Sequence, residues 1–356
     1  MTRLKANFPE LKPGQRLALL LLSALCLSCS RPDPGHELKL HAFGTVVSLA
    51  IHAADPATAE AASAALQAEF RRVDADWYPW QKPGNAADGE LRRLNEAIAG
   101  GRTFAVSADL ARLIRVAAEL EDRSEGRFNP AIGALTELWG FNDAADIAAE
   151  PPERERLAGL DLSAMSARHL RWDGDSLSSQ SSGVMLDLGG IAKGAILELS
   201  AALLRQHGIG NAIVDIGGDL IVLGNVHGRA ARIGIRSPSS DGVIGWLQVA
   251  AGEAVLTSGD YERYFEYQGQ RYQHILDPQT GSPVAHTSAV TVVHRDAVLA
   301  DAAATALVVA GAADFDRVCR LLGVEDALLI TATGDLRLTD AMRKRVKWSD
   351  GSEHMQ

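Results

Sequence analysis

Residues 186–194, with the sequence Leu-Asp-Leu-Gly-Gly-Ile-Ala-Lys-Gly, constrain the fold of this chain more than any other stretch. An apolar run typical of a β-strand ends in an acidic residue and two glycines, and a helical pattern, 191–204, follows at once. Glycines let the backbone approach a ligand closely, and the start of a helix offers unpaired N–H groups that suit phosphate. A related run, Asp-Ile-Gly-Gly-Asp-Leu, stands at 215–220. One glycine pair after a strand is commonly an ordinary turn, but two beside acidic strand ends favour a ligand site.

The composition is that of a globular chain. Its 356 residues, 47% of them hydrophobic, suffice for one large domain or two moderate ones. The formal net charge of −10 argues against a nucleic-acid partner, because no basic stripe is available to neutralise phosphates. The scarce aromatic residues gather at 77–80 and 261–272, which suits either a planar ligand or core packing.

The N-terminus is typical of a processing segment. Basic residues precede an apolar run, Leu17–Leu27, that is short for a membrane span and suited to a signal peptide. Ser28 before Cys29 resembles a bacterial lipobox, whose cysteine is lipidated and becomes the first mature residue. We therefore expect a signal peptide at 1–28, a lipidated Cys29 and tether at 29–37, one domain at 38–345 and a tail at 346–356. The expected location is the periplasm with a lipid anchor; a plain signal peptide and an uncleaved anchor are the alternatives.

Strands and helices are mixed without a regular β-α-β alternation, which predicts an α+β fold. A strand or a hairpin interrupted at Gly44 is expected over 38–53, and a hairpin around Gln268 and Gly269. Ser107 is a plausible N-cap for a helix over 108–123. Segment 142–158 is expected to be a surface excursion, and the lone Cys319 of the folded part a buried apolar residue. The other main helices are expected at 56–73, 89–99, 191–207 and 299–310, and further strands at 212–216, 220–223, 232–236, 247–250, 254–257, 289–293, 328–331 and 336–338.

Two later segments carry side chains suited to catalysis. In 300–305, Asp301 and Thr305 are four residues apart and so share one helical face, where a carboxylate and a hydroxyl suit Mg²⁺. The simpler interpretation is that Asp301 is only an acid favoured near a helix N-terminus. In 274–281, a fully specified Asp-Pro-x-Thr-Gly turn follows His274, which would end a strand and accept a proton near neutral pH. A histidine there could also be purely structural.

Together these segments resemble, in order, the FAD:protein FMN transferases, or ApbE family. The resemblance spans nearly the whole chain after the leader, and six motifs in order are far more specific than any one of them. The motifs are Phe43-Gly-Thr, Asp187-Leu-Gly-Gly-Ile-Ala-Lys-Gly, Asp215-Ile-Gly-Gly-Asp, Thr257-Ser-Gly-Asp-Tyr, His274-Ile-Leu-Asp-Pro-x-Thr-Gly and Ala300-Asp-Ala-Ala-Ala-Thr.

The resemblance implies a fold, an activity and partners. The fold would be α+β with mixed or antiparallel sheets and packed helices, a T-fold-like flavin transferase architecture. The activity would be Mg²⁺-dependent cleavage of FAD and covalent transfer of FMN to a Thr or Ser hydroxyl of an acceptor flavoprotein, with release of AMP. Family members are periplasmic, often lipoproteins, and their acceptors are subunits of membrane redox complexes.

The resemblance also implies roles for individual residues. The metal ligands would be the Asp301 carboxylate, the Thr305 hydroxyl and the Gly190 carbonyl. His274 would accept the proton of the incoming hydroxyl, with Asp301, or no dedicated base, as the rival assignments. Residues that would contact FAD are Phe43 (where the family usually has Met), Trp80, Arg127, Phe128, Asn129, Asp187, Lys193 and Ile275.

Two other functions remain compatible with the same residues. An Mg²⁺-dependent FAD pyrophosphatase would use the same site with water in place of the protein hydroxyl, and would release free FMN and AMP. A non-catalytic periplasmic flavin-binding lipoprotein would need the glycines and aromatics, but not Asp301, Thr305 and His274 together. A domain with no ligand site is the remaining alternative.

Overall fold

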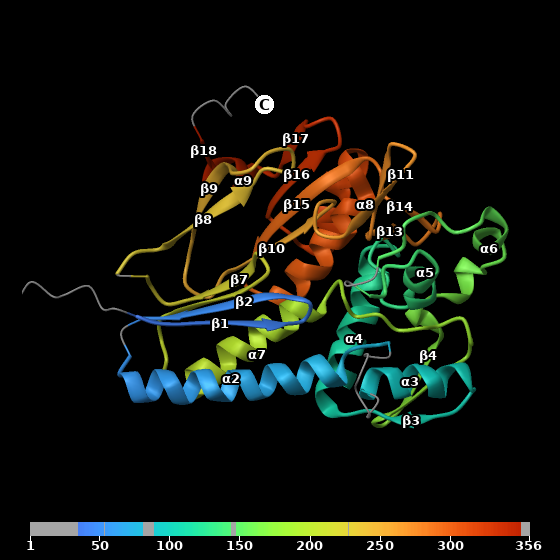
Figure 1. Cartoon of the computed structure of the whole chain (residues 1–356), viewed down its shortest axis with the longest axis horizontal. Helices are drawn as coiled ribbons and strands as arrows, with labels where there is room; N and C mark the ends of the chain where they lie inside the picture. The colour runs from blue at the N-terminus through green and yellow to red at the C-terminus, as the bar shows by residue number, and fades with distance from the viewer. Residues whose placement is uncertain (1–34, 53, 81–88, 144–146, 227, 350–356) are drawn as a thin grey trace, which may run out of the picture.

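The computed structural model describes residues 35–52, 54–80, 89–143, 147–226 and 228–349. The expected signal peptide, Cys29 and most of the tether lie outside the described residues. Within them, helices pack around a large antiparallel sheet (Figure 1). The α+β prediction is confirmed.

The central sheet has eight strands, and every neighbouring pair in it is antiparallel. The first hairpin pairs with a strand from the middle of the chain, so this sheet is completed only by distant segments. In spatial order the strands are β1 His36–Ala42, β2 Thr45–Ile51, β6 Ala212–Ile216, β7 Asp219–Leu223, β10 Ala254–Gly259, β15 Thr287–His294, β16 Asp326–Thr331 and β17 Leu336–Leu338.

The turn between β1 and β2 contains Phe43 and Gly44, both with positive φ, at 56° and 72°. Positive φ at both central residues is what a tight two-residue hairpin turn requires. The Phe43 ring lies edge-on to Phe70, with 5.6 Å between ring centroids, so the turn is tied to helix α2, Pro56–Asp76. The hairpin predicted around Gly44 is confirmed.

Two helices cover one face of the central sheet. Helix α7, Ala192–Gln206, packs against β6 and β7, and helix α8, Ala297–Leu322, packs against β10 and β15. The two helices also contact each other, and α2 lies across α7 beside β1 (Figure 1). This packing brings the start of α7, with its glycine pair, against the start of α8. The remaining helices are α3 Glu90–Ala99, α4 Ala108–Arg123, α5 Gly133–Leu138, α6 Arg154–Ala158 and α9 Asp340–Arg345, with short 3-10 turns at Leu162–Ala164 and Ala167–His169.

Helix α8 is longer than expected. The sequence indicated a helix over 299–310, but the structure continues it to Leu322 across a break at Gly311, where φ is 64° and ψ is −176°. A Cβ at Gly311 would come within 2.4 Å of the His286 ring, so only glycine fits this position. The helix is long and apolar enough to cross a bilayer. Its apolar side chains are nevertheless largely buried in the protein core, and Cys319 is buried among them as predicted.

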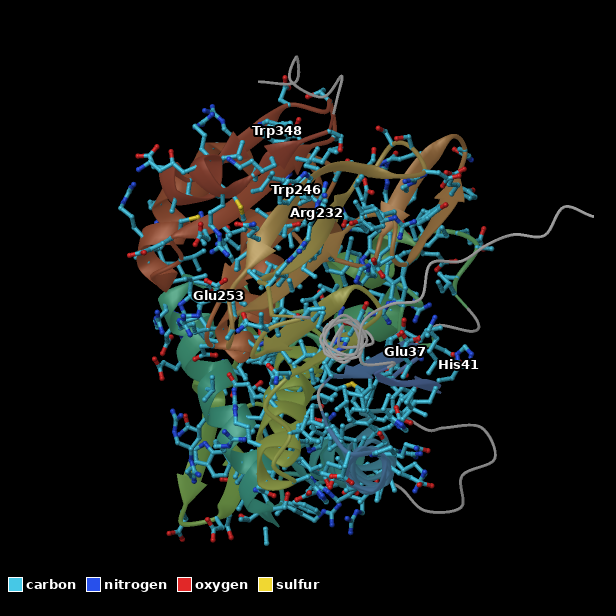
Figure 2. The ribbon with its side chains drawn as sticks, turned by 90° about the vertical axis from the view of Figure 1, so that its left-hand side faces the viewer. Glu37, His41, Arg232, Trp246, Glu253 and Trp348 are labelled. Carbon is cyan, nitrogen blue, oxygen red and sulfur yellow. The ribbon has the colours of Figure 1, made fainter. Side chains whose placement is uncertain are left out.

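A small sheet covers the other face of the central sheet. It consists of β8 Ala231–Arg236, β9 Val243–Val249 and β18 Lys347–Trp348, in the order β18-β9-β8. Val222 and Val255 of the central sheet and Leu247 of β9 belong to one buried apolar cluster between the two sheets. Figure 2 shows Arg232 beside Trp246 on this sheet, with the guanidinium carbon 3.9 Å from the ring centroid, and Trp348 near them. The folded domain therefore extends past the boundary expected at 345.

The third part of the fold lies beside α5. The predicted hairpin around Gln268 and Gly269 is confirmed as β11 Tyr264–Tyr267 and β12 Gln270–Gln273, and β13 Leu276–Asp277 pairs with β14 Ser282–Pro283. The described residues of segment 142–158 are all exposed or half-buried, as expected for a surface excursion. Within it, the half-buried Ala148 and Leu157 pack against the apolar cluster under this hairpin. A further sheet, β3 Phe104–Ala105, β5 Ser176–Ser179 and β4 Leu170–Asp173, packs beside α3 (Figure 1).

Candidate active site

The glycine pair at 189–190 brings the start of α7 against α8. A Cβ at Gly190 would lie 3.2 Å from Thr305 Oγ1 and 3.3 Å from Phe128 Cε2, so the backbone approaches both side chains closely. At Gly194, a Cβ would lie 2.2 Å from the carbonyl oxygen of Ala297, at the first residue of α8. The structure therefore places the backbone of Gly190 close to the Thr305 side chain, and both belong to the three expected metal ligands.

Asp301 faces the same junction from α8. Its side chain is buried, with 4% of the residue exposed, and its Oδ2 accepts a hydrogen bond from the Gly194 N–H at 2.8 Å. One turn further along α8, Thr305 Oγ1 lies 3.3 Å from the Ser258 hydroxyl on β10. Asp301 and Thr305 thus both point to the cluster of α7, α8 and β10, as the spacing of four residues predicted.

Burial raises the pKa of Asp301 to about 7. Lys193 opposes this effect and Asp219 reinforces it, because the first is a nearby cation and the second a nearby carboxylate. In the absence of a metal ion, Asp301 is therefore partly protonated near neutral pH. Binding of a divalent cation to the carboxylate would release that proton.

Lys193 forms an ion pair with Asp219, at the first residue of β7. Asp219 is 2% exposed, and its Oδ1 also accepts a hydrogen bond from the Thr257 N–H at 2.7 Å. Burial lowers the pKa of Lys193, but the attraction of Asp219 and Asp301 outweighs it, so the pKa is raised overall and the ammonium stays charged. The sequence indicated Asp219 only as the end of a glycine motif, and nothing in its spacing revealed this partner of Lys193.

Asp187 holds the glycine turn in place. Its Oδ1 accepts a hydrogen bond from the Gly189 N–H at 2.9 Å, and its Oδ2 accepts one from the Thr136 hydroxyl at 3.2 Å. Burial raises the pKa of Asp187. The carboxylate expected to contact FAD is thus engaged with its own turn and with α5, and it supports the site by fixing Gly190.

His274 lies just after β12 in a half-buried position. Its Nδ1 is 3.2 Å from the carbonyl oxygen of Arg263. A carbonyl can only accept, so Nδ1 carries the proton and Nε2 keeps its lone pair. Burial lowers the pKa of His274 well below its usual value, and the nearby cations Arg263 and Lys193 lower it further. The ring is therefore neutral at pH 7, with one nitrogen able to accept a proton.

The turn after His274 has the hydrogen bonds that its sequence indicated. Asp277 Oδ1 accepts from the Gln279 N–H at 2.9 Å, and Gly281 closes the turn with a φ of 71°. Ile275, expected to pack on the flavin, is buried in the main core, and its carbonyl accepts a hydrogen bond from the Val284 N–H at 3.0 Å. This rigid turn fixes the position of the histidine.

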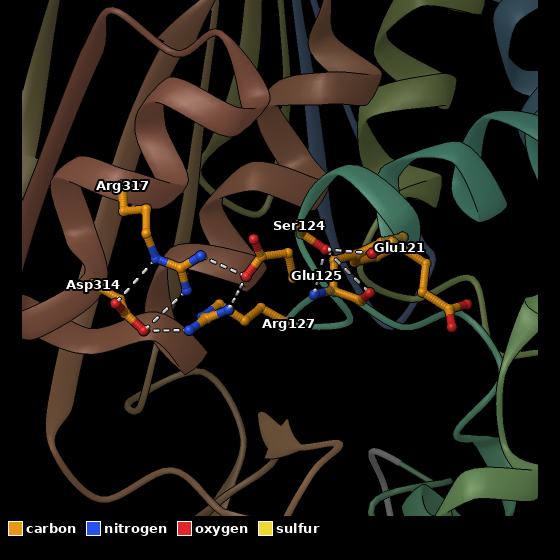
Figure 3. Close-up of polar contacts among 7 residues, drawn as sticks. Glu121, Ser124, Glu125, Arg127, Asp314 and Arg317 are labelled. Atoms are coloured by element: carbon orange, nitrogen blue, oxygen red, sulfur yellow. Dashed lines mark hydrogen bonds and ion pairs between the residues drawn. The ribbon is translucent and has the colours of Figure 1, made fainter.

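Residues 127–129 form the loop expected on the adenosine side of FAD. Only Phe128 of this loop lies at the junction of α7 with α8, whereas Arg127 and Asn129 bond to other parts of the protein. The Phe128 ring lies against Gly190, as described above. Arg127 instead forms ion pairs with Asp314 and Glu125, which join Arg317 in a network that ties the loop to the second half of α8 (Figure 3). This network engages the guanidinium that was expected to contact FAD.

Asn129, Trp80 and Phe43 were also expected to contact FAD. The Asn129 side chain is used at both ends within the protein: Nδ2 donates to the Met165 carbonyl and Oδ1 accepts from the Ala131 N–H, each at 2.8 Å. Trp80 lies edge-on to Tyr78 at 5.8 Å, next to the undescribed segment 81–88. Phe43 packs on Phe70 in the first hairpin. The structure does not bring these three side chains into contact with Asp301 or Thr305.

The donor set suits Mg²⁺. Among the described residues, no group of three His, Cys, Asp or Glu side chains could hold a metal ion. A cation here would instead be held by the Asp301 carboxylate, the Thr305 hydroxyl and the carbonyl of Gly190. One carboxylate with neutral oxygens matches the habit of Mg²⁺, which retains waters and takes further ligands from substrate phosphates.

Comparison with known proteins gives consistent matches. The sequence profile of the ApbE family matches residues 43–329. The FAD:protein FMN transferase of Rhodobacter capsulatus is 39% identical over 345 residues, which cover 94% of this chain and 64% of the relative's length. The protein of the same name from Vibrio cholerae is 34% identical over 298 residues, which cover 83% of this chain and 86% of the relative.

Solved structures match as well. The ApbE protein of Thermotoga maritima has a TM-score of 0.79 at 28% identity and covers 88% of this chain and 99% of its own. The flavin transferase ApbE of Vibrio cholerae has a TM-score of 0.76 at 27% identity, covering 88% of this chain and all of its own.

Proposed function

This chain belongs to the ApbE family, and we propose that it is an FAD:protein FMN transferase that uses Mg²⁺ to cleave FAD and transfers FMN to a Thr or Ser hydroxyl of an acceptor flavoprotein. The observation that carries the proposal is the junction of α7 with α8. A buried carboxylate, Asp301, a hydroxyl, Thr305, and a closely packed glycine, Gly190, meet there with the charged Lys193, which in turn acts electrostatically on the neutral His274.

The reaction is a phosphoryl transfer. The oxygen of the acceptor hydroxyl forms a bond to the phosphorus that carries the riboflavin part of FAD, and the bond from that phosphorus to the bridging oxygen breaks. AMP leaves with that oxygen, and the hydroxyl proton passes to Nε2 of His274. Asp301, Thr305 and the Gly190 carbonyl would hold Mg²⁺, whose charge would offset that of the pyrophosphate and the leaving group.

The side chains around the junction position the reacting groups and neutralise the charge of the pyrophosphate. Lys193 is fixed by Asp219 and adds a second positive charge near the pyrophosphate, and the N-terminus of α7 favours an anion at the same place. Asp187 and Phe128 keep Gly190 close to Thr305. Such positioning and charge neutralisation are what phosphoryl transfer needs most, because its loose transition state demands little covalent chemistry.

A direct test mixes the purified protein with FAD, Mg²⁺ and a candidate acceptor domain and follows the mass of the acceptor. We expect the acceptor to gain the mass of FMN and AMP to appear in equal amount, only when Mg²⁺ is present. Free FMN without a labelled acceptor would instead identify an FAD pyrophosphatase. Binding of FAD with no product of either kind would identify a flavin carrier.

We further propose that the protein is exported and anchored through a lipid on Cys29, where it meets acceptor subunits of membrane redox complexes. The support is the basic and apolar leader followed by Ser28 and Cys29. Cys29→Ala should release a soluble, active protein into the periplasm, because the first strand begins only at His36 and stable anchoring needs the acyl chains. Fractionation and activity assays of both fractions check this. A Cys29→Ala protein still embedded in membrane would show that Leu17–Leu27 is an uncleaved anchor.

A further inference from the structure

A groove of about 850 Å³ lies beside the candidate active site. Its walls come from four segments that are distant in sequence: the loop at 238–239, the β11–β12 turn at 269–271, the stretch 284–288 that leads into β15, and the β16–β17 turn at 331–334. Asp260 and Gln273 also line it. None of the residues so far assigned to the metal or to FAD lines this groove.

Two of the side chains that line the groove are almost fully buried and carry an oxygen without a hydrogen bond. Gln273 is 2% exposed and Thr287 is 1% exposed. Within the described part of the chain, neither Gln273 Oε1 nor Thr287 Oγ1 has a hydrogen-bond partner. Buried polar atoms are nearly always paired in native proteins, so unpaired ones in the wall of a groove indicate that a ligand completes them.

The orientation of Gln273 fixes the chemistry of that ligand. Its amide nitrogen donates to the carbonyls of Val284, at 2.8 Å, and Thr287, at 3.1 Å. The amide therefore cannot turn round, and Oε1 can only accept. Asp260 Oδ1 also accepts no hydrogen bond among the described residues, although it lies 3.7 Å from Arg271 in an ion pair. A ligand that complements the groove is therefore rich in N–H or O–H donors.

The groove shares two chain segments with the active site. Strand β12 ends at Gln273, and the next residue is His274. Neighbouring residues of an extended chain face opposite sides; accordingly, the Gln273 amide bonds to the 284–287 stretch, whereas the His274 ring bonds to Arg263. On β10, Ser258 contacts Thr305, and Asp260 lies two residues further on. A chain bound in the groove therefore lies one strand away from the transfer site.

We propose that this groove binds a segment of the acceptor polypeptide, in an extended conformation, one strand away from the transfer site at His274. The inference rests on the proposed transferase function, which needs a second substrate site next to the FAD site. An extended polypeptide supplies the required donors, because its main-chain N–H groups recur at regular spacing along each side. The paired charges of Asp260 and Arg271 suit a polar segment of low net charge.

The first test replaces Thr287 with Val, which has nearly the same shape and no hydroxyl. Wild-type protein is incubated with FAD, Mg²⁺ and a library of short synthetic peptides with one central Thr, and the peptide that it labels fastest is the probe. Thr287→Val should raise KM for this peptide about 3- to 10-fold, as loss of one hydrogen bond does. The affinity for FAD should stay unchanged. The melting temperature should not fall, since the lost hydroxyl has no partner within the protein.

The second test fills the groove. Ala285 lines it and is exposed, so Ala285→Trp should raise KM for the peptide at least about tenfold while FAD still binds. Ala251→Trp is the matched control, because Ala251 is also exposed but lies in the turn before β10, at the opposite end of that strand from Asp260. It should leave KM unchanged.

The outcomes separate this inference from the function on which it rests. Unchanged peptide KM in both Thr287→Val and Ala285→Trp, with wild-type labelling intact, would overturn the groove assignment and leave the transferase standing. In that case, a higher melting temperature of Thr287→Val would show that its hydroxyl is merely an unpaired group. A wild-type protein that labels neither peptides nor acceptor domains would contradict the transferase proposal itself.

Discussion

Asp301→Ala should lower the rate of FMN transfer by a factor of about 10³ in a protein that still folds. Asp301 is the only carboxylate among the three expected ligands, so its loss leaves Thr305 and the Gly190 carbonyl, two neutral oxygens, to hold a divalent cation. Initial rates measured over a range of Mg²⁺ concentrations check this. Near-normal turnover at saturating Mg²⁺ would remove Asp301 from the site.

The pH dependence of folding provides an independent check on Asp301. Burial raises its pKa from an ordinary value near 3.8 to about 7, so between these values the folded state binds more protons than the unfolded state. Without Mg²⁺, ionisation of this carboxylate therefore lowers the free energy of unfolding progressively as pH rises through this window. Asp301→Asn removes that cost, and its melting temperature should exceed that of the wild type increasingly from pH 4 to pH 7. Parallel melting curves for the two proteins would show that the carboxylate is not desolvated.

His274→Ala should lose transfer by about 10²- to 10⁴-fold, as loss of a general base does, and should retain its affinity for FAD. His41→Ala is a control, because His41 is exposed on the edge strand β1 (Figure 2). Transfer kinetics and FAD titration are the measurements. A variant that no longer binds FAD would make His274 a ligand contact. Unchanged transfer would mean that the reaction needs no dedicated base.

The wild-type pH profile should reflect the burial of His274. Its pKa lies well below the usual 6.5, so the ring stays neutral and able to accept a proton as pH falls through 6.5. At saturating Mg²⁺, transfer should therefore show no loss centred at that pH. A loss at 6.5 that disappears in the His274→Ala variant would show that the ring is solvated in the active protein.

Local patterns predicted much of the fold. Alternating apolar residues and the Gln268-Gly269 turn gave both hairpins, and the six ordered motifs gave the family, which the profile match over 43–329 confirms. Ser107 is the N-cap residue of α4, as predicted, but its side chain makes no capping hydrogen bond. The Ser107 hydroxyl does not cap its own helix; it donates to Glu90 Oε2 at 2.7 Å, and Glu90 Oε1 accepts the Ser107 N–H. A carboxylate 17 residues away supplies the acceptor, which no local pattern reveals.

The candidate site was harder to predict for the same reason. Asp301 and Thr305 could be grouped because helical periodicity sets their relation. The pairing of Lys193 with Asp219 and the contact of Ser258 with Thr305 depend on how helices lie on a sheet. Arg127 was expected near FAD because the family uses this loop to line the adenosine side. Its charge is matched by Asp314, which lies in the part of α8 that the sequence did not indicate.

The strand order has a consequence for synthesis of the protein. Strand β2 ends at Ile51, and its second neighbour, β6, begins at Ala212. A ribosome makes about 5–20 residues per second, so the roughly 160 residues between them take about 8 to 32 s. During that time strand β2 of the nascent hairpin, which includes Val47 and Leu49, has an open edge, because β6 has not yet been made. Such open edges invite association with other chains, so the first hairpin is exposed to wrong pairing until β6 joins β2.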